Sequence, residues 1–163
     1  MNYKKITKIQ YKGEKLKIEW LQNAPSGHTD KKSIETKTEP HNDFVKTFRQ
    51  LDKHLCREAE LPMSEGEFKR HDIQLVQLSY EKDEMENDVM FASITSERMM
   101  ESSDEFMKIT SPMKPETASL GLPLHSDTVD AIDKLIQETV LFLDGKRHDL
   151  FSMTATAKAV VND

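Results

Sequence analysis

Apolar and charged residues alternate near the start of the chain. Residues 16–20 place leucine, isoleucine and tryptophan between single charged residues, which is the period of a strand with one buried face. A second apolar series lies before Lys12 and Gly13, where glycine accepts the positive φ of a tight turn. The pattern predicts an N-terminal β-hairpin with a bulge between Ile6 and Ile9, where the alternation slips.

Further strand patterns follow in the middle of the chain. Residues 33–39 alternate isoleucine and threonine with polar residues and stop at a proline. Residues 73–80 change phase midway, as a bulged central strand does, and an acidic turn separates them from the strand pattern of residues 89–95. Residues 105–110 form the last candidate strand. We expect residues 22–32, which contain Asn, Pro, Ser, Gly and Asp, to form an exposed loop.

Two segments follow the helical period. The first is capped by Asn42 or Asp43, whose side chains can accept hydrogen bonds from first-turn amides, and it ends at the Leu-Pro pair 61–62. Its apolar positions are Phe44, Phe48, Leu51 and Leu55. The second helix begins at Ser126 and ends before Gly145, a natural residue to follow a helix. Its predicted buried stripe is Val129, Ile132, Ile136, Val140 and Leu143, supplemented by Leu135 and Phe142.

These elements predict an α+β fold, in which an antiparallel sheet of five to six strands carries two amphipathic helices packed on one face. A chain of 163 residues can bury about 70% of its unfolded surface as a single domain. Hydrophobic residues make up 36% and charged residues 32%, which indicates one modest core with long polar loops. We assign this domain to residues 1–148. Residues 149–163 form a C-terminal tail, either docked on the core or available to a partner.

Cys56 is the single cysteine, which excludes an internal disulfide and a multi-cysteine zinc site. Its helical phase places it beside apolar residues, so we interpret it as a buried filler and not as a nucleophile. The N-terminus has no signal-peptide stretch, and no apolar run approaches the roughly 20 residues that span a bilayer. We therefore expect a cytoplasmic protein without membrane association.

Nine methionines are present, and most of them lie in the central third of the chain. Methionine suits adaptable partner surfaces because its thioether chain is flexible and polarisable. It also fills irregular gaps in cores, and we favour this second interpretation.

The N-terminal hairpin is basic although the chain carries a net charge of −6. Residues 1–20 hold six lysines, whereas residues 81–105 hold nine acidic residues. A protein that grips single-stranded nucleic acid or a nucleotide uses lysines to attract phosphate and aromatic rings to stack bases. The residues that could do so here are Lys8, Lys12, Lys15, Lys17, Tyr11 and Trp20. We favour the simpler interpretation, in which the lysines keep an edge strand soluble.

Motifs for catalysis and cofactor binding are absent from the sequence. The five glycines lie more than ten residues apart, so the sequence contains neither a phosphate-binding loop nor a dinucleotide-binding fingerprint. There is no Gly-x-Ser-x-Gly elbow and no pair of histidines at helical metal-ligand spacing. We therefore predict no cofactor, no metal site and no enzymatic activity. A small enzyme whose site is built from scattered histidines and acids stays as the third hypothesis.

Near the C-terminus, Asp149, Leu150 and Phe151 resemble the end of the short peptide by which replication and repair proteins bind the bacterial sliding clamp. Arg147 and His148 stand where that peptide has Gln and Leu. An exposed Leu-Phe pair is costly unless something covers it. These residues are therefore either a partner-docking peptide or, as we favour, part of the protein's own core.

Several short segments, in order along the chain, resemble a group of small bacteriophage and prophage proteins without a settled activity. They are residues 4–9, 16–20, 40–44, 54–56 and 142–147, followed by Leu150 and Phe151. The resemblance implies a viral accessory role, encoded near replication or recombination functions, and no catalytic residues. We expect a non-enzymatic protein of the host cytoplasm that binds a host or phage protein of DNA metabolism, or inhibits a host defence. A nucleotide or single-strand binder is the alternative, and nothing in the sequence specifies an oligomeric state.

Overall fold

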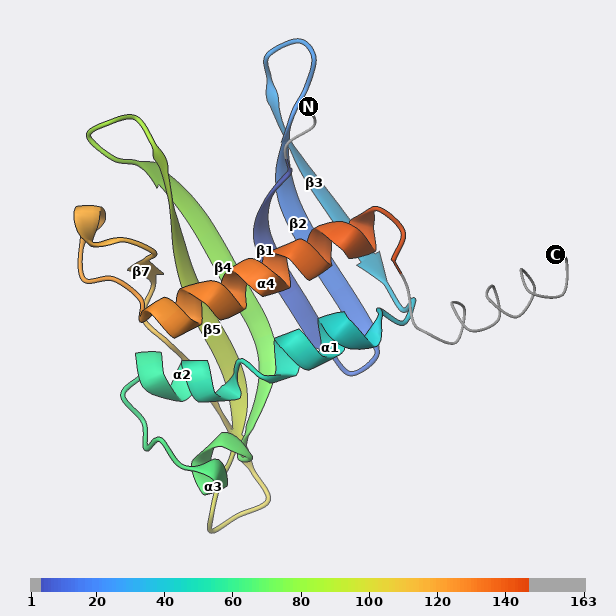
Figure 1. Cartoon of the computed structure of the whole chain (residues 1–163). Coiled ribbons are helices and arrows are strands. Elements are labelled where there is room, and N and C mark those ends of the chain that lie inside the picture. Colours follow the sequence, from blue (N-terminus) through green and yellow to red (C-terminus); the bar gives the residue numbers. More distant parts are fainter. Residues whose placement is uncertain (1–3, 147–163) are drawn as a thin grey trace, which may run out of the picture.

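The computed structural model describes residues 4–146, which form an antiparallel sheet with helices on one of its faces (Figure 1). The strands are β1 (Lys4–Lys12), β2 (Lys15–Asn23), β3 (Thr29–Thr36), β4 (His71–Lys82), β5 (Asp88–Met99), β6 (Phe106–Thr110) and β7 (Lys114–Pro115). The helices are α1 (Asn42–Arg49), α2 (Asp52–Glu58), α3 (Glu65–Phe68) and α4 (Ser126–Leu143), with a 3-10 turn at Ala118–Leu120. The order in the sheet is β3-β2-β1-β4-β5-β6, and the short β7 also pairs with β5. The predicted fold class is confirmed.

The N-terminal hairpin is confirmed in detail. Gly13 has a φ of +62° in the turn between β1 and β2, in the left-handed region that favours glycine. The pairing of β1 with β2 shifts between Ile6 and Lys8, which is the predicted bulge. The bulge keeps both Ile6 and Ile9 fully buried on the same face of the sheet.

A row of apolar side chains crosses the sheet in register and forms the centre of the core. Ile9 of β1 lies opposite Ile18 of β2 and opposite Val76 of β4. The row continues to Ile34 in β3 and to Ile94 in β5. Because successive residues of a strand point to opposite faces, the side chains of this row all lie on one face of the sheet, and this is the face that the helices cover. No helix among residues 4–146 covers the other face of the sheet, which we call the open face.

The third strand differs from its prediction. It was expected over residues 33–39 after an exposed loop, but β3 begins at Thr29 and ends at Thr36. Its first residues are polar and exposed, and they pair with β2 from Asn23 to Leu21. An edge strand with little buried surface has no apolar alternation to reveal it, so the composition of residues 22–32 pointed to a loop.

The predicted first helix is two helices. α1 ends at Arg49 and α2 starts at Asp52, although no proline or glycine marks the break. The cap of α1 is His41 and not Asn42 or Asp43, because the His41 Nδ1 accepts a hydrogen bond from the Asp43 amide at 3.0 Å. The apolar residues of both helices are nevertheless buried as expected. The prediction is therefore wrong about the continuity of the helix and right about which side chains face the core.

The short helix α3 was not predicted. It follows the Leu-Pro pair 61–62, and its cap is Ser64, whose hydroxyl accepts a hydrogen bond from the Glu67 amide at 3.3 Å. Four residues are too few for an apolar period to appear in the sequence.

The long helix α4 confirms its predicted extent, and Gly145 follows it with a φ of +116°. Its N-cap is His125 and not Ser126. The buried carboxylate of Glu58 accepts a hydrogen bond from the His125 amide at 3.2 Å and also contacts the His125 ring. This contact fixes the start of α4 against the end of α2.

The buried stripe of α4 is rotated relative to its prediction. The fully buried positions are Thr128, Ile132, Leu135, Thr139 and Phe142, while Val129, Ile136, Val140 and Leu143 are half-buried. The Thr139 hydroxyl donates to the Leu135 carbonyl at 2.7 Å, and the Thr128 hydroxyl lies 3.2 Å from the His54 Nδ1. Threonines whose hydroxyl groups are hydrogen-bonded in this way can be buried, so the pattern of apolar residues alone does not reveal them.

Four aromatic rings join β1, α1 and α4. Phe44 stacks on Phe48 with ring centroids 6.0 Å apart, and Tyr11 meets both rings edge-on. Phe142 lies 6.4 Å from Phe44. Phe44, Phe48 and Phe142 are each 1% exposed, so this cluster packs α1 and α4 against the N-terminal hairpin without access to water.

Cys56 is fully buried, as interpreted from the sequence, and burial raises the pKa of its thiol to about 11. Among residues 4–146, no helix combines the length and apolar character needed to cross a membrane. Asp149, Leu150 and Phe151 lie outside the described residues, so both interpretations of the tail stay predictions.

Candidate functional site

The predicted lysines and aromatic residues lie on opposite faces of the sheet. Lys8, Lys12, Lys15 and Lys17 lie on the open face. Tyr11 and Trp20 lie on the helix-covered face, where both pack against the core. The Trp20 indole donates a hydrogen bond to Gln22 at 3.1 Å. The lysines and the two aromatic rings of the nucleic-acid alternative therefore do not share one face of the sheet.

Three of these lysines form ion pairs with glutamates of the same face. Lys8 lies 3.5 Å from Glu19, Lys12 lies 2.9 Å from Glu97, and Lys15 lies 2.6 Å from Glu35. Affinity for nucleic acid comes from lysines that replace the counterions of phosphates, and a carboxylate beside each lysine opposes this. The open face is thus a surface of mixed charge.

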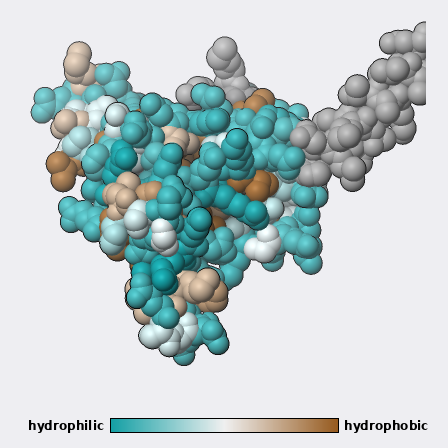
Figure 2. Space-filling model, turned by 60° about the horizontal axis from the view of Figure 1, so that its bottom comes forward, coloured by the Kyte–Doolittle hydropathy of each residue, from teal (hydrophilic) through white to brown (hydrophobic). Residues whose placement is uncertain are grey.

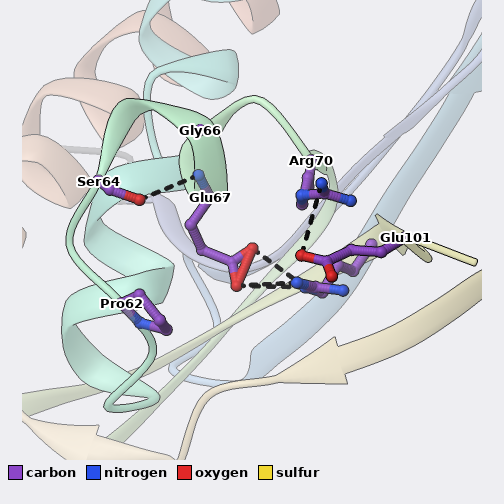
Figure 3. Close-up of a pocket in the computed structure, with 7 residues that line it drawn as sticks. Pro62, Ser64, Gly66, Glu67, Arg70 and Glu101 are labelled. Carbon is purple, nitrogen blue, oxygen red and sulfur yellow. Dashed lines mark hydrogen bonds and ion pairs between the residues drawn. The ribbon is translucent and has the colours of Figure 1, made fainter.

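The end of the sheet near α3 has a buried ion pair. The Glu67 carboxylate, 8% exposed, accepts hydrogen bonds from Arg98 Nε and Nη2, each at 3.0 Å (Figure 3). Glu67 belongs to α3 and Arg98 to the end of β5, so the pair ties this helix to the sheet. A two-point arginine–carboxylate contact is both strong and directional.

His71 extends this pair into a cluster. Its side chain is fully buried, its Nδ1 lies 2.8 Å from the Ser96 hydroxyl, and its Nε2 lies 3.4 Å from the Glu67 carboxylate. Burial lowers the pKa of His71, although Glu67 acts in the opposite direction. His54 is also buried, and burial lowers its pKa in the same way.

These two histidines predict a loss of stability in mild acid. The folded protein holds them neutral, while the unfolded chain binds protons below the ordinary pKa of 6.5. Their contribution is therefore complete above that pH and is lost as the pH falls. We expect urea unfolding midpoints to fall from about pH 7 to about pH 5, and less so in the double variant His54→Asn/His71→Asn. An unchanged pH profile in this variant would contradict the assignment.

Two hollows flank the cluster, and Arg70 lines both. One has a volume of about 290 Å³ and is lined by Pro62, Ser64, Gly66, Glu67, Arg70, Arg98 and Glu101 (Figure 3). The other has a volume of about 310 Å³ and is lined by Arg49, Asp52, Phe68, Lys69, Arg70, His71, Asp72, Ile73, Met99 and Phe106. The second hollow is the more apolar, because aromatic and aliphatic side chains form part of its wall.

Exposed apolar side chains stand at the rim of this second hollow. Met99 of β5 lies opposite Phe106 of β6, and they are 48% and 59% exposed. Met107, next in β6, is 45% exposed. Figure 2, in which this end of the molecule comes forward, shows hydrophobic areas within a largely hydrophilic surface. We name Phe68, Met99, Phe106, Arg49, Lys69 and Arg70 the α3-end surface.

The methionines correct an expectation from the sequence. Met63, Met85, Met99, Met107 and Met113 are exposed, whereas Met90 lies in the core. The expectation that the methionines fill the core is therefore wrong for most of the methionines that the structure describes. The signal available in the sequence was the Phe106-Met107 pair, because two adjacent apolar residues in a strand cannot both face the core.

The described part of the chain has no group of three or more histidine, cysteine, aspartate or glutamate side chains placed to hold a metal ion. Comparison of the chain with protein-family models, with curated proteins and with solved structures gave no match.

Proposed function

We propose that this protein is a non-enzymatic binding protein whose α3-end surface docks an acidic, amphipathic segment of a partner protein. The observation that carries the proposal is the exposed Met99–Phe106 pair beside a hollow lined by Phe68 and Ile73. In line with the phage resemblance, the partner would be a host or phage protein of DNA metabolism or of host defence.

The apolar part of the surface supplies the affinity. Exposed apolar side chains that adjoin one another are typical of interaction sites, since isolated ones are scattered over any surface. Covering Phe106 and Met99 with a partner side chain would contribute about 1–3 kcal/mol each. Methionine and phenylalanine are also enriched in protein interfaces.

The charges favour an acidic partner. Arg49, Lys69 and Arg70 line the hollow with Asp52 and Asp72, and Arg70 also lies 3.5 Å from Glu101, so Arg49 and Lys69 are the cations that a partner would meet. These two side chains can each pair with a carboxylate of an acidic segment and so orient it at the apolar rim.

The scaffold beneath the surface is firmly held. The Met99 amide donates a hydrogen bond to the Arg70 carbonyl at 2.9 Å, which joins the end of β5 to the segment that follows α3. The Glu67–Arg98 pair fixes the same two elements from the side chains. Because the elements that carry the rim are already held together, less conformational entropy is lost when a partner binds.

Peptide titration tests this function. Peptides that combine acidic residues with one aromatic anchor should shift the NMR signals of the α3-end surface, whereas basic or purely polar peptides of equal length should not. Phe106→Ser should weaken binding by about 10-fold or more, because the main apolar contact is lost. The matched control is Leu122→Ser, since Leu122 is 78% exposed but lies outside this surface. Equal effects of both variants would contradict the proposal.

The nucleic-acid alternative is tested in parallel. A variant in which Lys8, Lys12, Lys15 and Lys17 are replaced by alanine keeps the α3-end surface intact. Salt-sensitive retention of the natural chain on single-stranded DNA, lost in this variant, would support the lysine face in place of peptide docking. The glutamates beside these lysines lead us to expect no such retention.

A further inference from the structure

The two edges of the sheet differ in whether they can accept another strand. At the far edge, β5 is paired with two short strands separated by Ser111, Pro112 and Met113, and Pro115 lies within β7. Proline has no amide hydrogen to donate, so a regular ladder at this edge cannot extend beyond the five residues of β6. At the other edge, β3 runs from Thr29 to Thr36 without a proline.

The β3 edge is long, and the part of the chain that the structure describes leaves it uncovered. Within residues 4–146, β3 pairs with β2 alone, and its residues are exposed except for the half-buried Ile34 and Thr36. An edge strand of this kind presents a row of unused amide and carbonyl groups to any strand that approaches it. Its side chains therefore determine which strand can pair.

We infer that β3 pairs with β3 of a second copy of this chain, as antiparallel edge strands related by a two-fold axis. Such an axis runs perpendicular to the sheet, so residues that face each other lie on the same face in both copies. With Ser33 on the axis, Lys31 of each copy lies opposite Glu35 of the other. The pattern Lys-x-Ser-x-Glu on the open face is thus complementary to itself.

Neighbouring symmetric registers are less favourable. With Lys32 on the axis, two lysines lie directly opposite each other, and like charges in that position are destabilising. With Ile34 on the axis, the strands overlap less and Lys31 lies opposite Lys37. The Ser33 register is the one that pairs β3 from Asp30 to Thr36 with opposite charges across the contact.

The lysines of β3 have another interpretation, in which they only prevent edge-to-edge association. That interpretation predicts a monomer at all concentrations, whereas the self-complementary charges predict a reversible dimer. A single pair of edge strands buries less than the roughly 1,200 Å² of a stable interface, so we expect a dissociation constant of roughly 10–100 µM.

Sedimentation velocity between about 5 and about 500 µM tests the inference, because it spans this dissociation constant. The natural chain should shift from monomer to dimer across the range. Lys31→Glu and Glu35→Lys should each weaken the dimer by about 10-fold, since each places like charges opposite one another twice. The double variant Lys31→Glu/Glu35→Lys should restore part of the dimer, because the pairing across the axis is reversed while the ion pair of Glu35 with Lys15 of the same chain is lost.

Lys32→Glu is the matched control. Lys32 lies on the helix-covered face, opposite Ile34 of the second copy in this register, so its charge should not alter the dimer. Circular dichroism of each variant checks that the sheet is intact. A natural chain that stays monomeric, or a dimer indifferent to all four variants, overturns the inference. So does a double variant that is no better than either single one.

This inference is independent of the proposed function, since β3 and the α3-end surface lie at different places in the sheet (Figure 1). Peptide binding can persist without the dimer, and the dimer can form without peptide binding. If both hold, a dimer presents two docking surfaces, and a partner with two acidic segments is bound more tightly than one with a single segment.

Discussion

Replacing Arg98 by methionine is expected to lower the free energy of unfolding by about 3–4 kcal/mol. The change leaves the Glu67 carboxylate, 8% exposed, without the hydrogen bonds that Arg98 Nε and Nη2 donate to it. A buried charge that has lost its partner retains the cost of its desolvation and gains nothing in return. Urea denaturation followed by circular dichroism measures the difference.

Two further variants separate this explanation from a general sensitivity of the region. Arg70→Met removes an arginine that lies 3.5 Å from the largely exposed Glu101, and it should cost less than about 0.5 kcal/mol. The double variant Glu67→Leu/Arg98→Met removes both buried charges and should recover much of the lost stability. A double variant less stable than Arg98→Met alone would show that packing, and not charge, holds α3 in place.

Replacing Phe44 by alanine is expected to cost about 3–5 kcal/mol, the usual range for a buried phenylalanine. Phe44 is 1% exposed and its ring meets those of Tyr11, Phe48 and Phe142. The substitution therefore leaves a cavity where β1, α1 and α4 join, and few of the surrounding side chains can move to fill this cavity.

The same urea experiment checks this prediction. Phe44→Leu keeps most of the volume and should cost about 1–1.5 kcal/mol. Leu141→Ala is the matched control on α4, because Leu141 is 43% exposed and should lose less than about 1 kcal/mol. A loss for Phe44→Ala no greater than that for Leu141→Ala would mean that the aromatic cluster does not join the helices to the hairpin.

The parts of the fold that the sequence predicted are those decided by local chemistry. The tight turn at Gly13, the bulge after Ile6 and the end of α4 before Gly145 each depend on neighbouring residues alone. The parts it did not predict depend on the rest of the molecule. The break between α1 and α2 has no marker in the sequence, and β3 has too little buried surface to show a period.

The candidate site shows the same division. Glu67, His71 and Arg98 come from α3, β4 and β5, and only the pairing of β4 with β5 brings His71 opposite Arg98. No local pattern indicates that contact. By contrast, the separation of Tyr11 from Lys12 was available in the sequence, because adjacent residues of a strand point to opposite faces. The alternation along β1 thus divides the candidate nucleic-acid residues between the two faces of the sheet.

The place of β1 in the sheet has a consequence for folding during synthesis. β1 lies between β2 and β4, yet β4 begins at His71. While the ribosome makes residues 13–70, the N-terminal hairpin can form but one side of β1 has no partner strand, and Ile9 and Ile18 are still uncovered by α4. Until β4 emerges, the nascent chain therefore exposes an unpaired strand edge that can associate with other chains. The need for a chaperone is greatest during this interval.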